Sequence, residues 1–296
     1  MELETSITIA RAIEIAQESQ LHHTTEWVLL SEASNRILNE DLPSKVDDPP
    51  LHVSAMDGWA VRVSDKQRIE IGTTAAGGPP TSIGKGEAVR IMTGAPIPKG
   101  ANAIVMVEDG INGKAHPNFI RKRGENLRKG ETNLVAGQVM TAAAISLAAT
   151  MGYETVPVRS KPRVAVISTG DELVSPGHEL KEGQIYESNS YGLCTLLEKI
   201  GCNPIHHNVV EDSIEGLRNT LNSVDCDAIL TSGGVSMGDF DFVRKLMEDE
   251  GELHFWKVAM RPGGPPLFGR WKGTPLFGVP GNPVSSQFQA MWFSEC

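Results

Sequence analysis

The sequence predicts an α/β protein that combines a three-layer domain built on a parallel sheet, a small β-barrel-like domain, and a helical, mixed linking domain. Strand and helix patterns alternate after Pro162, which is typical of a parallel sheet. Between residues 51 and 138, short β-rich runs are separated by glycine and proline, and helical patterns flank this block. A length of 296 residues, of which 40% are hydrophobic, is enough for two or three such cores.

Composition and charge exclude several classes of protein. The formal charge of −10 disfavours nonspecific binding to nucleic acid, so we expect no nucleic-acid partner. No apolar run approaches the roughly 18 residues needed to span a bilayer, and the N-terminus lacks the apolar core of a signal peptide. The four cysteines show no CxxC spacing and are interpreted as reduced, buried thiols, which favours a cytoplasmic location without a membrane partner.

The linking domain is predicted from elements on both sides of the β-rich block. Residues 7–18 place apolar side chains at helical spacing, residues 26–30 alternate like a strand, and "TAAAISLAATMG" (141–152) is again helical. The proline-bearing "DLPSKVDDPP" (41–50) marks a boundary between them. We therefore expect a linking domain formed by residues 1–45 and 139–161, an inserted β-rich domain at 46–138, and an α/β domain at 162–296.

Three apolar strands organise the predicted α/β domain, namely "RVAVIS", "PIHHNVV" and "DAILTS". Continuous apolar strands of this kind indicate a sheet that is covered by helices on both faces. In such sheets, ligands bind beyond the carboxyl ends of the strands. The loops at 168–173, 209–213 and 231–241 leave those ends and carry polar residues, so we expect a binding site where they meet.

The loop "TSGGVSMGDFD" (231–241) has the composition of a phosphate site with a metal ion. Its glycines allow close approach of the backbone, and its N–H groups and the following helix favour an anion. Two carboxylates there would repel that anion unless a hard cation such as Mg²⁺ lay between them. We assign Ser232, Gly233, Gly234, Ser236 and Gly238 to the ligand and Asp239 and Asp241 to the metal. Helix capping by Asp239 and a helix-dipole role for Asp241 remain open alternatives.

Further candidate residues follow other strands of the α/β domain. Glu172 in "STGDEL" is either a site carboxylate or part of a solvated turn, and Asp212 is either a site carboxylate or an ordinary acid at a helix start. Lys257 and Arg261 would meet an oxyanion unless they form a solvated face. "VPGNPVSS" is a close turn that leads into a helix, with Pro283 near its first turn.

The β-rich block contributes its own polar candidates. "SAMDGWAV" holds Asp57 in a tight turn, and "IMTGAPIPKGA" places Thr93 at a strand end. Five basic residues lie between 121 and 129, either on a solvated edge strand or in contact with an anionic part of a substrate.

Seven motifs in this order resemble the molybdopterin molybdenumtransferase family, of the MoeA and gephyrin E-domain type. They are "SAMDGWAV", "RIMTGAPIPKGANAIVM", "ISTGDEL", "IYESNSYGL", "TSGGVSMGDFDF", "FWKVAMRPG" and "GVPGNPVS", and they span more than 220 residues. The resemblance implies insertion of molybdate into adenylylated molybdopterin with release of AMP and with Mg²⁺ as cofactor. It also implies that the parallel-sheet domain binds molybdopterin, that the protein is a homodimer, and that other cofactor-synthesis proteins are possible partners.

The resemblance also assigns roles to residues. Asp57, Thr93, Glu172, Asp212 and Asp241 are the expected catalytic residues, Lys257 and Arg261 the basic ones, and Pro280 and Pro283 shape the "PGNP" turn. Mg²⁺ would be held by Glu172 with Asp239 or Asp241, and the two basic residues would hold molybdate. The family usually continues into a C-terminal β domain, which we expect to be absent here because the sequence reaches Cys296 inside the preceding helical run.

Three alternatives to the enzyme interpretation remain. The chain could bind molybdopterin or its adenylate without turnover, or act as an interaction scaffold, or adenylylate molybdopterin. The sequence offers no linker or proline-rich tail for a scaffold, and the β-rich insertion with "SAMDGWAV" disfavours the adenylyltransferase.

Overall fold

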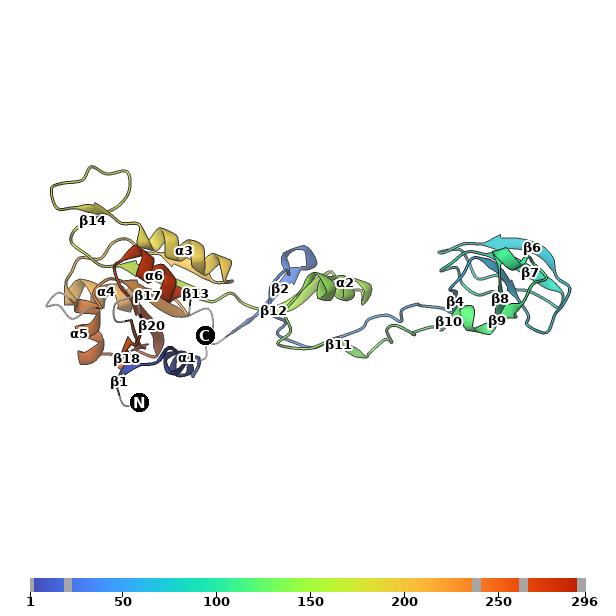
Figure 1. Cartoon of the computed structure of the whole chain (residues 1–296), viewed down its shortest axis with the longest axis horizontal. Coiled ribbons are helices and arrows are strands. Elements are labelled where there is room, and N and C mark those ends of the chain that lie inside the picture. The colour runs from blue at the N-terminus through green and yellow to red at the C-terminus, as the bar shows by residue number, and fades with distance from the viewer. Residues whose placement is uncertain (1–2, 19–22, 236–240, 261–265, 292–296) are drawn as a thin grey trace. The chain divides into compact units, whose positions relative to one another are not determined.

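The computed structural model describes residues 3–18, 23–235, 241–260 and 266–291. The chain divides into two compact units, one made of residues 1–24 and 160–296 and the other of residues 25–159 (Figure 1). Each unit has its own buried core, and each is described by itself below.

The first unit is a three-layer α/β domain around a seven-stranded sheet. In spatial order its strands are β1 (Glu4–Ile7), β18 (Glu252–Val258), β19 (Leu267–Trp271), β20 (Thr274–Val279), β17 (Ala228–Ser232), β13 (Arg163–Ser168) and β16 (Asn203–His206). Neighbouring strands are parallel except at β19, which pairs antiparallel with both β18 and β20. The predicted parallel sheet is therefore present, with one reversed strand that the sequence pattern did not reveal.

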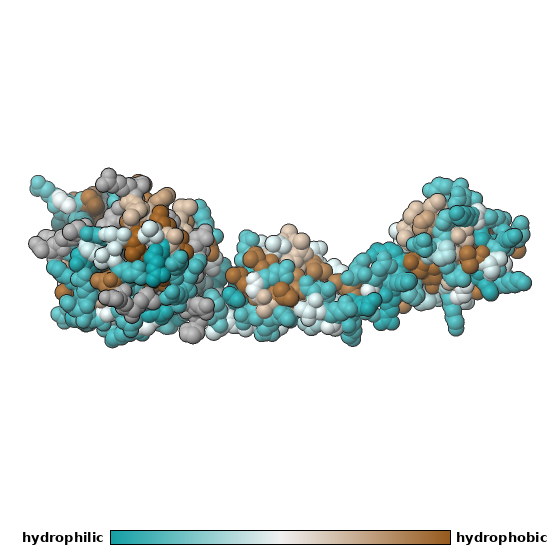
Figure 2. All heavy atoms as spheres, turned by 60° about the horizontal axis from the view of Figure 1, so that its bottom comes forward, coloured by the Kyte–Doolittle hydropathy of each residue, from teal (hydrophilic) through white to brown (hydrophobic). Residues whose placement is uncertain are grey.

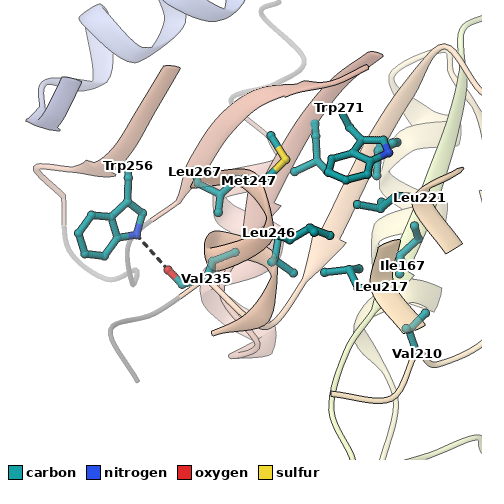
Figure 3. Close-up of a cluster of buried hydrophobic side chains, with 13 residues drawn as sticks. Ile167, Val210, Leu217, Leu221, Val235, Leu246, Met247, Trp256, Leu267 and Trp271 are labelled. Carbon is teal, nitrogen blue, oxygen red and sulfur yellow. Dashed lines mark hydrogen bonds between the residues drawn. The ribbon is translucent and has the colours of Figure 1, made fainter. Parts of the chain in front are cut away.

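Helices cover both faces of this sheet. On one face, α4 (Ile214–Ser223) and α5 (Phe242–Asp249) bury Leu217, Leu221 and Leu246 against the strands (Figure 3). On the other, α3 (Asn189–Lys199) and α6 (Pro283–Ala290) pack against β13, β17 and β20. Apolar residues on both faces of the central strands explain why those strands are continuously hydrophobic.

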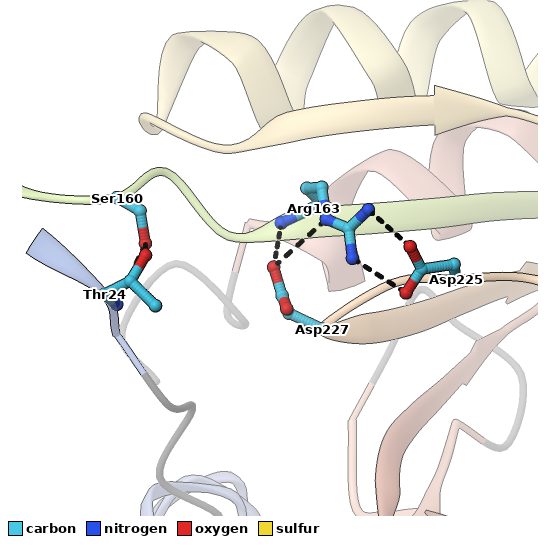
Figure 4. A network of polar contacts seen from close by, with 5 residues as sticks. All are labelled: Thr24, Ser160, Arg163, Asp225 and Asp227. Atoms are coloured by element: carbon cyan, nitrogen blue, oxygen red, sulfur yellow. Dashed lines mark hydrogen bonds and ion pairs between the residues drawn. The ribbon is translucent and has the colours of Figure 1, made fainter. Parts of the chain in front are cut away.

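The start of β13 is fixed by an ionic network at the amino ends of the strands (Figure 4). The Arg163 guanidinium donates two hydrogen bonds of 2.9 Å to the Asp225 carboxylate, and the Arg163 backbone N–H donates to Asp227 at 2.7 Å. Bidentate pairing of this kind adds geometric specificity more than stability at an exposed position. It ties β13 to the loop that precedes β17.

The N-terminal segment belongs to this sheet and not to the linking domain, where the sequence analysis placed residues 1–45. Strand β1 pairs parallel with β18, and α1 (Ile9–Gln17) buries Ile15 in a cluster with Phe255 and Phe268. An amphipathic pattern identifies a helix and its apolar face but not the partner of that face, because both domains offer apolar surfaces. The prediction of a helix was correct, and its domain assignment was wrong.

The second unit contains the linking elements and the β-rich block. Strand β2 (Thr25–Leu29) pairs antiparallel with β12 (Thr155–Arg159), and β3 (Leu42–Pro43) with β11 (Thr132–Leu134). Helix α2 (Ala142–Thr150) begins at Thr141, whose hydroxyl caps the helix by accepting from the Ala144 N–H, and it packs on these strands.

The β-rich block forms a five-stranded sheet with two edges. Its order is β6 (Ile69–Thr74), β7 (Glu87–Ile91), β5 (Gly58–Val61), β8 (Ala103–Met106) and β9 (Ala115–His116), and β4 (Val53–Ser54) pairs with β10 (Ile120–Arg121) nearby. Alternating residues of β5 enter two different clusters, with Ala60 on one face and Val61 on the other. Buried side chains therefore lie on both faces of the sheet, although β6 is exposed along most of its length.

The polar surface and the free cysteines agree with the predictions made from the composition. Hydrophilic residues cover most of the face seen in Figure 2. Across the described parts of the chain, no helix combines the length and apolarity needed to cross a bilayer. The described cysteines, Cys194, Cys202 and Cys226, are free and half-buried, and burial raises the pKa of the Cys194 thiol to about 11, so this thiol is protonated at neutral pH.

The placement of α1 on the sheet can be tested by Ile15→Ala. Ile15 is fully buried, so we expect the variant to lower the free energy of unfolding of the sheet domain by about 2–5 kcal/mol. Native-state hydrogen exchange should locate the loss in β18 and leave β2 and β12 unchanged. The matched control Ile9→Ala, at an exposed position of the same helix, should cost less than about 1 kcal/mol. A loss of protection in β2 and β12 would contradict this placement.

Candidate active site at the carboxyl edge of the sheet

The loops that follow the central strands are joined by backbone hydrogen bonds. The Thr169 N–H donates to the Ser232 carbonyl at 3.1 Å, and the Gly233 N–H donates to the Val279 carbonyl at 3.0 Å. The Gly170 N–H donates to the Val210 carbonyl at 3.4 Å. The loops after β13, β16, β17 and β20 therefore meet at one edge, as the sequence predicted for the first three of them.

A cavity of about 300 Å³ lies at this edge. Residues after β13, β17 and β20 line it together with the start of α3 and a short parallel pair of strands, β14 (Leu173–Val174) and β15 (Ile185–Tyr186). Six of the predicted site residues are among its lining: Glu172, Asp212, Ser232, Gly233, Gly234 and Pro283. The structure thus brings together residues from four separate motifs.

Gly233 and Gly234 are required by contacts within the protein. Both have positive φ, of 97° and 66°. A Cβ on Gly233 would lie 2.7 Å from the Thr169 carbonyl oxygen, and one on Gly234 would lie 2.9 Å from the Val243 side chain. The glycines let the loop pack against β13 and α5, which is a different reason from the close approach of a ligand that the sequence suggested.

The cavity wall at α3 rests on a buried carboxylate that the sequence analysis did not single out. Glu187 is 3% exposed and accepts hydrogen bonds from the Ser190 N–H, the Ser190 hydroxyl and the Ser168 hydroxyl at 2.6–2.9 Å. Ser188, the N-cap residue, makes no capping bond with its side chain. Glu187 therefore caps α3 and joins it to the end of β13.

Asn189, at the start of the same helix, bridges two of the loops. Its amide nitrogen donates to the Ser232 hydroxyl and to the Gly281 carbonyl, both at 2.8 Å. Asn189 and Glu187 lie in the motif "IYESNSYGL", which carried part of the family resemblance but received no functional role. The sequence does not indicate which loops two polar residues at the start of a helix will contact. The motif was therefore the only signal for these two residues.

Several carboxylates interact with one another at or near the cavity. The Asp212 N–H donates to the Asp171 carboxylate at 3.0 Å. Burial raises the pKa of Asp212, and the neighbouring charges of Asp171, Glu172 and Asp241 raise it further. The predicted acids Glu172, Asp212 and Asp241 are thus close enough to interact. Asp241 is 8% exposed at the N-cap position of α5.

The donor set suits a cation that keeps part of its water shell. Within the described residues, no three His, Cys, Asp or Glu side chains are grouped so as to hold a metal ion. Mg²⁺ usually takes one or two protein carboxylates and completes its shell with water and phosphate oxygens. Two carboxylates that line the cavity, those of Glu172 and Asp212, are enough for a site of that kind.

Four of the predicted site residues lie outside the described residues: Ser236, Gly238, Asp239 and Arg261. Pro280 is described and half-buried, and two residues later Asn282 is the N-cap of α6, which begins at Pro283. The Asn282 side chain caps that helix by accepting from the Val284 and Ser285 N–H groups at 3.1 Å. The "PGNP" turn is therefore held by a helix cap.

Lys257 has an unusual backbone conformation. Its φ is 68°, which is rare for a residue with a side chain, and its N–H donates to the Pro266 carbonyl at 3.0 Å. Its ammonium lies 4.1 Å from the centre of the Trp256 ring. The indole N–H of Trp256 donates to the Val235 carbonyl at 3.1 Å (Figure 3). Lys257 does not line the cavity, but Trp256 links it to the glycine loop. Strain of this kind is characteristic of functional positions.

Asp57 and Thr93 form a pair in the second unit. The Thr93 N–H and hydroxyl both donate to the Asp57 carboxylate, at 2.7 and 3.0 Å, and these bonds lower the pKa of Asp57. Both side chains are exposed. The structure thus brings together the two candidates of the β-rich block, which lie 36 residues apart in sequence, as a hydrogen-bonded pair.

Comparisons with known proteins agree with both units. A model of the MoeA N-terminal region (domain I and II) matches residues 7–152, and a model of a probable molybdopterin binding domain matches residues 165–294. The molybdopterin molybdenumtransferase of Haemophilus influenzae is 39% identical over 279 residues, which cover 88% of this chain and 69% of that relative. The chain belongs to the molybdopterin molybdenumtransferase family. Another member, from Bacillus subtilis, is 34% identical and covers 96% of this chain and 72% of its own length.

A solved structure supports the same assignment. The molybdopterin biosynthesis MoeA protein of Pyrococcus horikoshii aligns with a TM-score of 0.81 at 32% identity, covering 97% of this chain and 78% of that protein. The cavity described above lies in the part of the chain that matches the molybdopterin-binding model of this family.

The requirement for glycine at position 233 can be tested by Gly233→Ala. Positive φ and the clash with Thr169 should lower the free energy of unfolding by about 1–3 kcal/mol in chemical denaturation. The matched control is Gly273→Ala, where φ is also positive but a Cβ would meet open space, so the expected loss is about 1 kcal/mol. Equal losses in both variants would show that the contact with Thr169 has no energetic importance.

The raised pKa of Asp212 predicts a pH-dependent stability. The native state binds the Asp212 proton more tightly than the unfolded chain does, so its contribution to stability is lost as pH rises through that pKa. Asp212→Asn should therefore match the wild-type Tm near pH 4 and exceed it near pH 7. Glu211→Gln, at the exposed neighbouring residue, should leave the Tm unchanged at both pH values. An Asp212→Asn protein that is less stable than wild type at pH 7 would contradict the proposed repulsion.

Proposed function

We propose that this chain inserts molybdate into adenylylated molybdopterin and releases AMP, the last step of molybdenum cofactor synthesis. The observation that carries the proposal is the cavity at the carboxyl edge of the sheet, in the part of the chain that matches a molybdopterin-binding model. The names of relatives that are 34–39% identical support the reaction type, a transferase.

The site residues have the chemistry that this reaction needs. In the proposal, the Ser232 hydroxyl and the loop N–H groups bind phosphate oxygens, as helix-preceding glycine loops commonly do. Ser236 and Gly238 extend that loop. Glu172 with Asp239 or Asp241 would hold Mg²⁺, which would supply neutralisation of the charge that develops when AMP leaves, and Asp212 is a further acidic residue of the site.

Basic residues complete the proposed arrangement. Lys257 and Arg261 hold molybdate as an oxyanion, which raises its effective concentration near the dithiolene of the pterin. Pro280 and Pro283 shape the turn on which the substrate rests. Asp57 and Thr93 act as a second polar group, and we expect them to complete the site of a partner in a homodimer.

The first test is AMP release from purified adenylylated molybdopterin, with molybdate and Mg²⁺ added in turn. We expect release only when both are present, and Asp241→Ala should reduce it about a hundredfold. Asp249→Ala, at an exposed acid on the same helix, should keep the wild-type rate. Circular dichroism of both variants checks that the fold is retained.

Two results would contradict the proposal. Release without molybdate would indicate simple hydrolysis of the phosphoanhydride. Tight binding of the adenylate without any release would support a binding module instead of an enzyme.

A further inference from the structure

The cavity is rich in hydrogen-bond acceptors. Three carboxylates line it, those of Glu172, Glu187 and Asp212, while lysine, arginine and histidine are absent from its described lining. A bare anion would be repelled by this wall. The cavity is therefore suited to a neutral group that donates hydrogen bonds.

The amide of Asn189 presents an acceptor that has no partner in the protein. Its nitrogen must be the atom that faces the Gly281 carbonyl, because a carbonyl oxygen only accepts hydrogen bonds. The opposite atom, Oδ1, is buried and has no hydrogen-bond partner among the described residues. Buried polar atoms are nearly always paired, so an unpaired acceptor at a cavity wall indicates a ligand that donates to it.

A second unpaired oxygen lines the same cavity. Thr169 is 7% exposed, and within the described part of the chain its hydroxyl also lacks a hydrogen-bond partner. Each of these oxygens can accept one hydrogen bond, and an amino group carries two N–H donors. A single ring N–H would satisfy only one of them.

Apolar side chains in the lining of the same cavity favour a flat ring. Leu173, Ile185 and Tyr186, from the β14–β15 pair, line the cavity, and Ile185 and Tyr186 are 55% and 48% exposed. Exposed apolar surface in the lining of a polar cavity is typical of a site for a planar heterocycle. Pro283 adds a further apolar surface from the turn before α6.

We propose that Asn189 determines specificity by accepting, at Oδ1, a hydrogen bond from the exocyclic amino group of the substrate's heterocycle, with the Thr169 hydroxyl as second acceptor. This inference rests on the proposed function. Adenylylated molybdopterin offers that chemistry at two ends, the 2-amino group of the pterin and the 6-amino group of adenine. Glu187 acts as a positioning residue, since its bonds to Ser190 and Ser168 fix the start of α3.

The test measures binding of two ligand pairs by isothermal titration calorimetry or pterin fluorescence. The first pair is 6-hydroxymethylpterin and its analogue without the 2-amino group, and the second is AMP and purine riboside 5′-monophosphate. Wild type should bind the amino-bearing member of one pair about 10- to 100-fold more tightly. That ratio should fall to about one in Asn189→Leu. It should also decrease in Thr169→Val, a near-isosteric change that removes only the unpaired hydroxyl.

The ratio separates recognition from a structural role, because a variant that only loosened the site would weaken both members of a pair equally. Asn203→Leu, at an exposed asparagine of the same domain, should retain the wild-type ratio. Loss of the ratio in the pterin pair places the pterin at Asn189, and loss in the adenine pair places adenine there. A ratio near one in wild type for both pairs, or one retained by both variants, would overturn the inference.

Intact adenylylated molybdopterin, titrated in parallel, keeps this result distinct from the proposed function. Binding of that substrate without any amino-dependent ratio removes the role of Asn189 and leaves the proposed function standing. No binding of that substrate by wild type would overturn the proposed function and, with it, the role of Asn189.

Discussion

The hydrogen bond from the Thr169 N–H to the Ser232 carbonyl extends the pairing of β13 and β17 beyond the strands and into their loops. This contact requires the following residue, Gly233, to lack a side chain and to adopt positive φ. Everything at the carboxyl edge depends on it. The cavity requires the two loops to lie side by side. So do the position of the Ser232 hydroxyl and the hydrogen bond that Asn189 donates to it.

Electrostatics and conformation work against stability at this edge. Burial and three neighbouring carboxylates disfavour the charged form of Asp212, and Lys257 holds a left-handed backbone conformation. The sheet compensates for such costs with apolar helices packed on both of its faces. Proteins commonly combine a well-packed scaffold with a strained, charged binding edge. The groups that bind a ligand lower the stability of the free protein.

The sequence predicted the parts of this site that depend on regular patterns. Apolar strands followed by polar loops implied that the loops meet at one edge of the sheet. Acidic residues within two of those loops indicated Glu172 and Asp212, which both line the cavity. Roles that depend on tertiary contacts were not predictable. Glu187, and not the N-cap residue Ser188, caps α3 with its side chain. Strand β1 is a four-residue strand without a distinctive pattern, and its partner β18 lies some 250 residues away.

Hydrogen exchange followed by mass spectrometry, with and without adenylylated molybdopterin, tests the central claim most directly. If the substrate binds at the carboxyl edge, backbone amides in 169–173, 187–190 and 232–234 should become protected together, because their loops form one hydrogen-bonded wall. The opposite end of the sheet, around 225–227, should not change. Protection confined to that opposite end, or absent from these three segments under saturating substrate, would contradict the account.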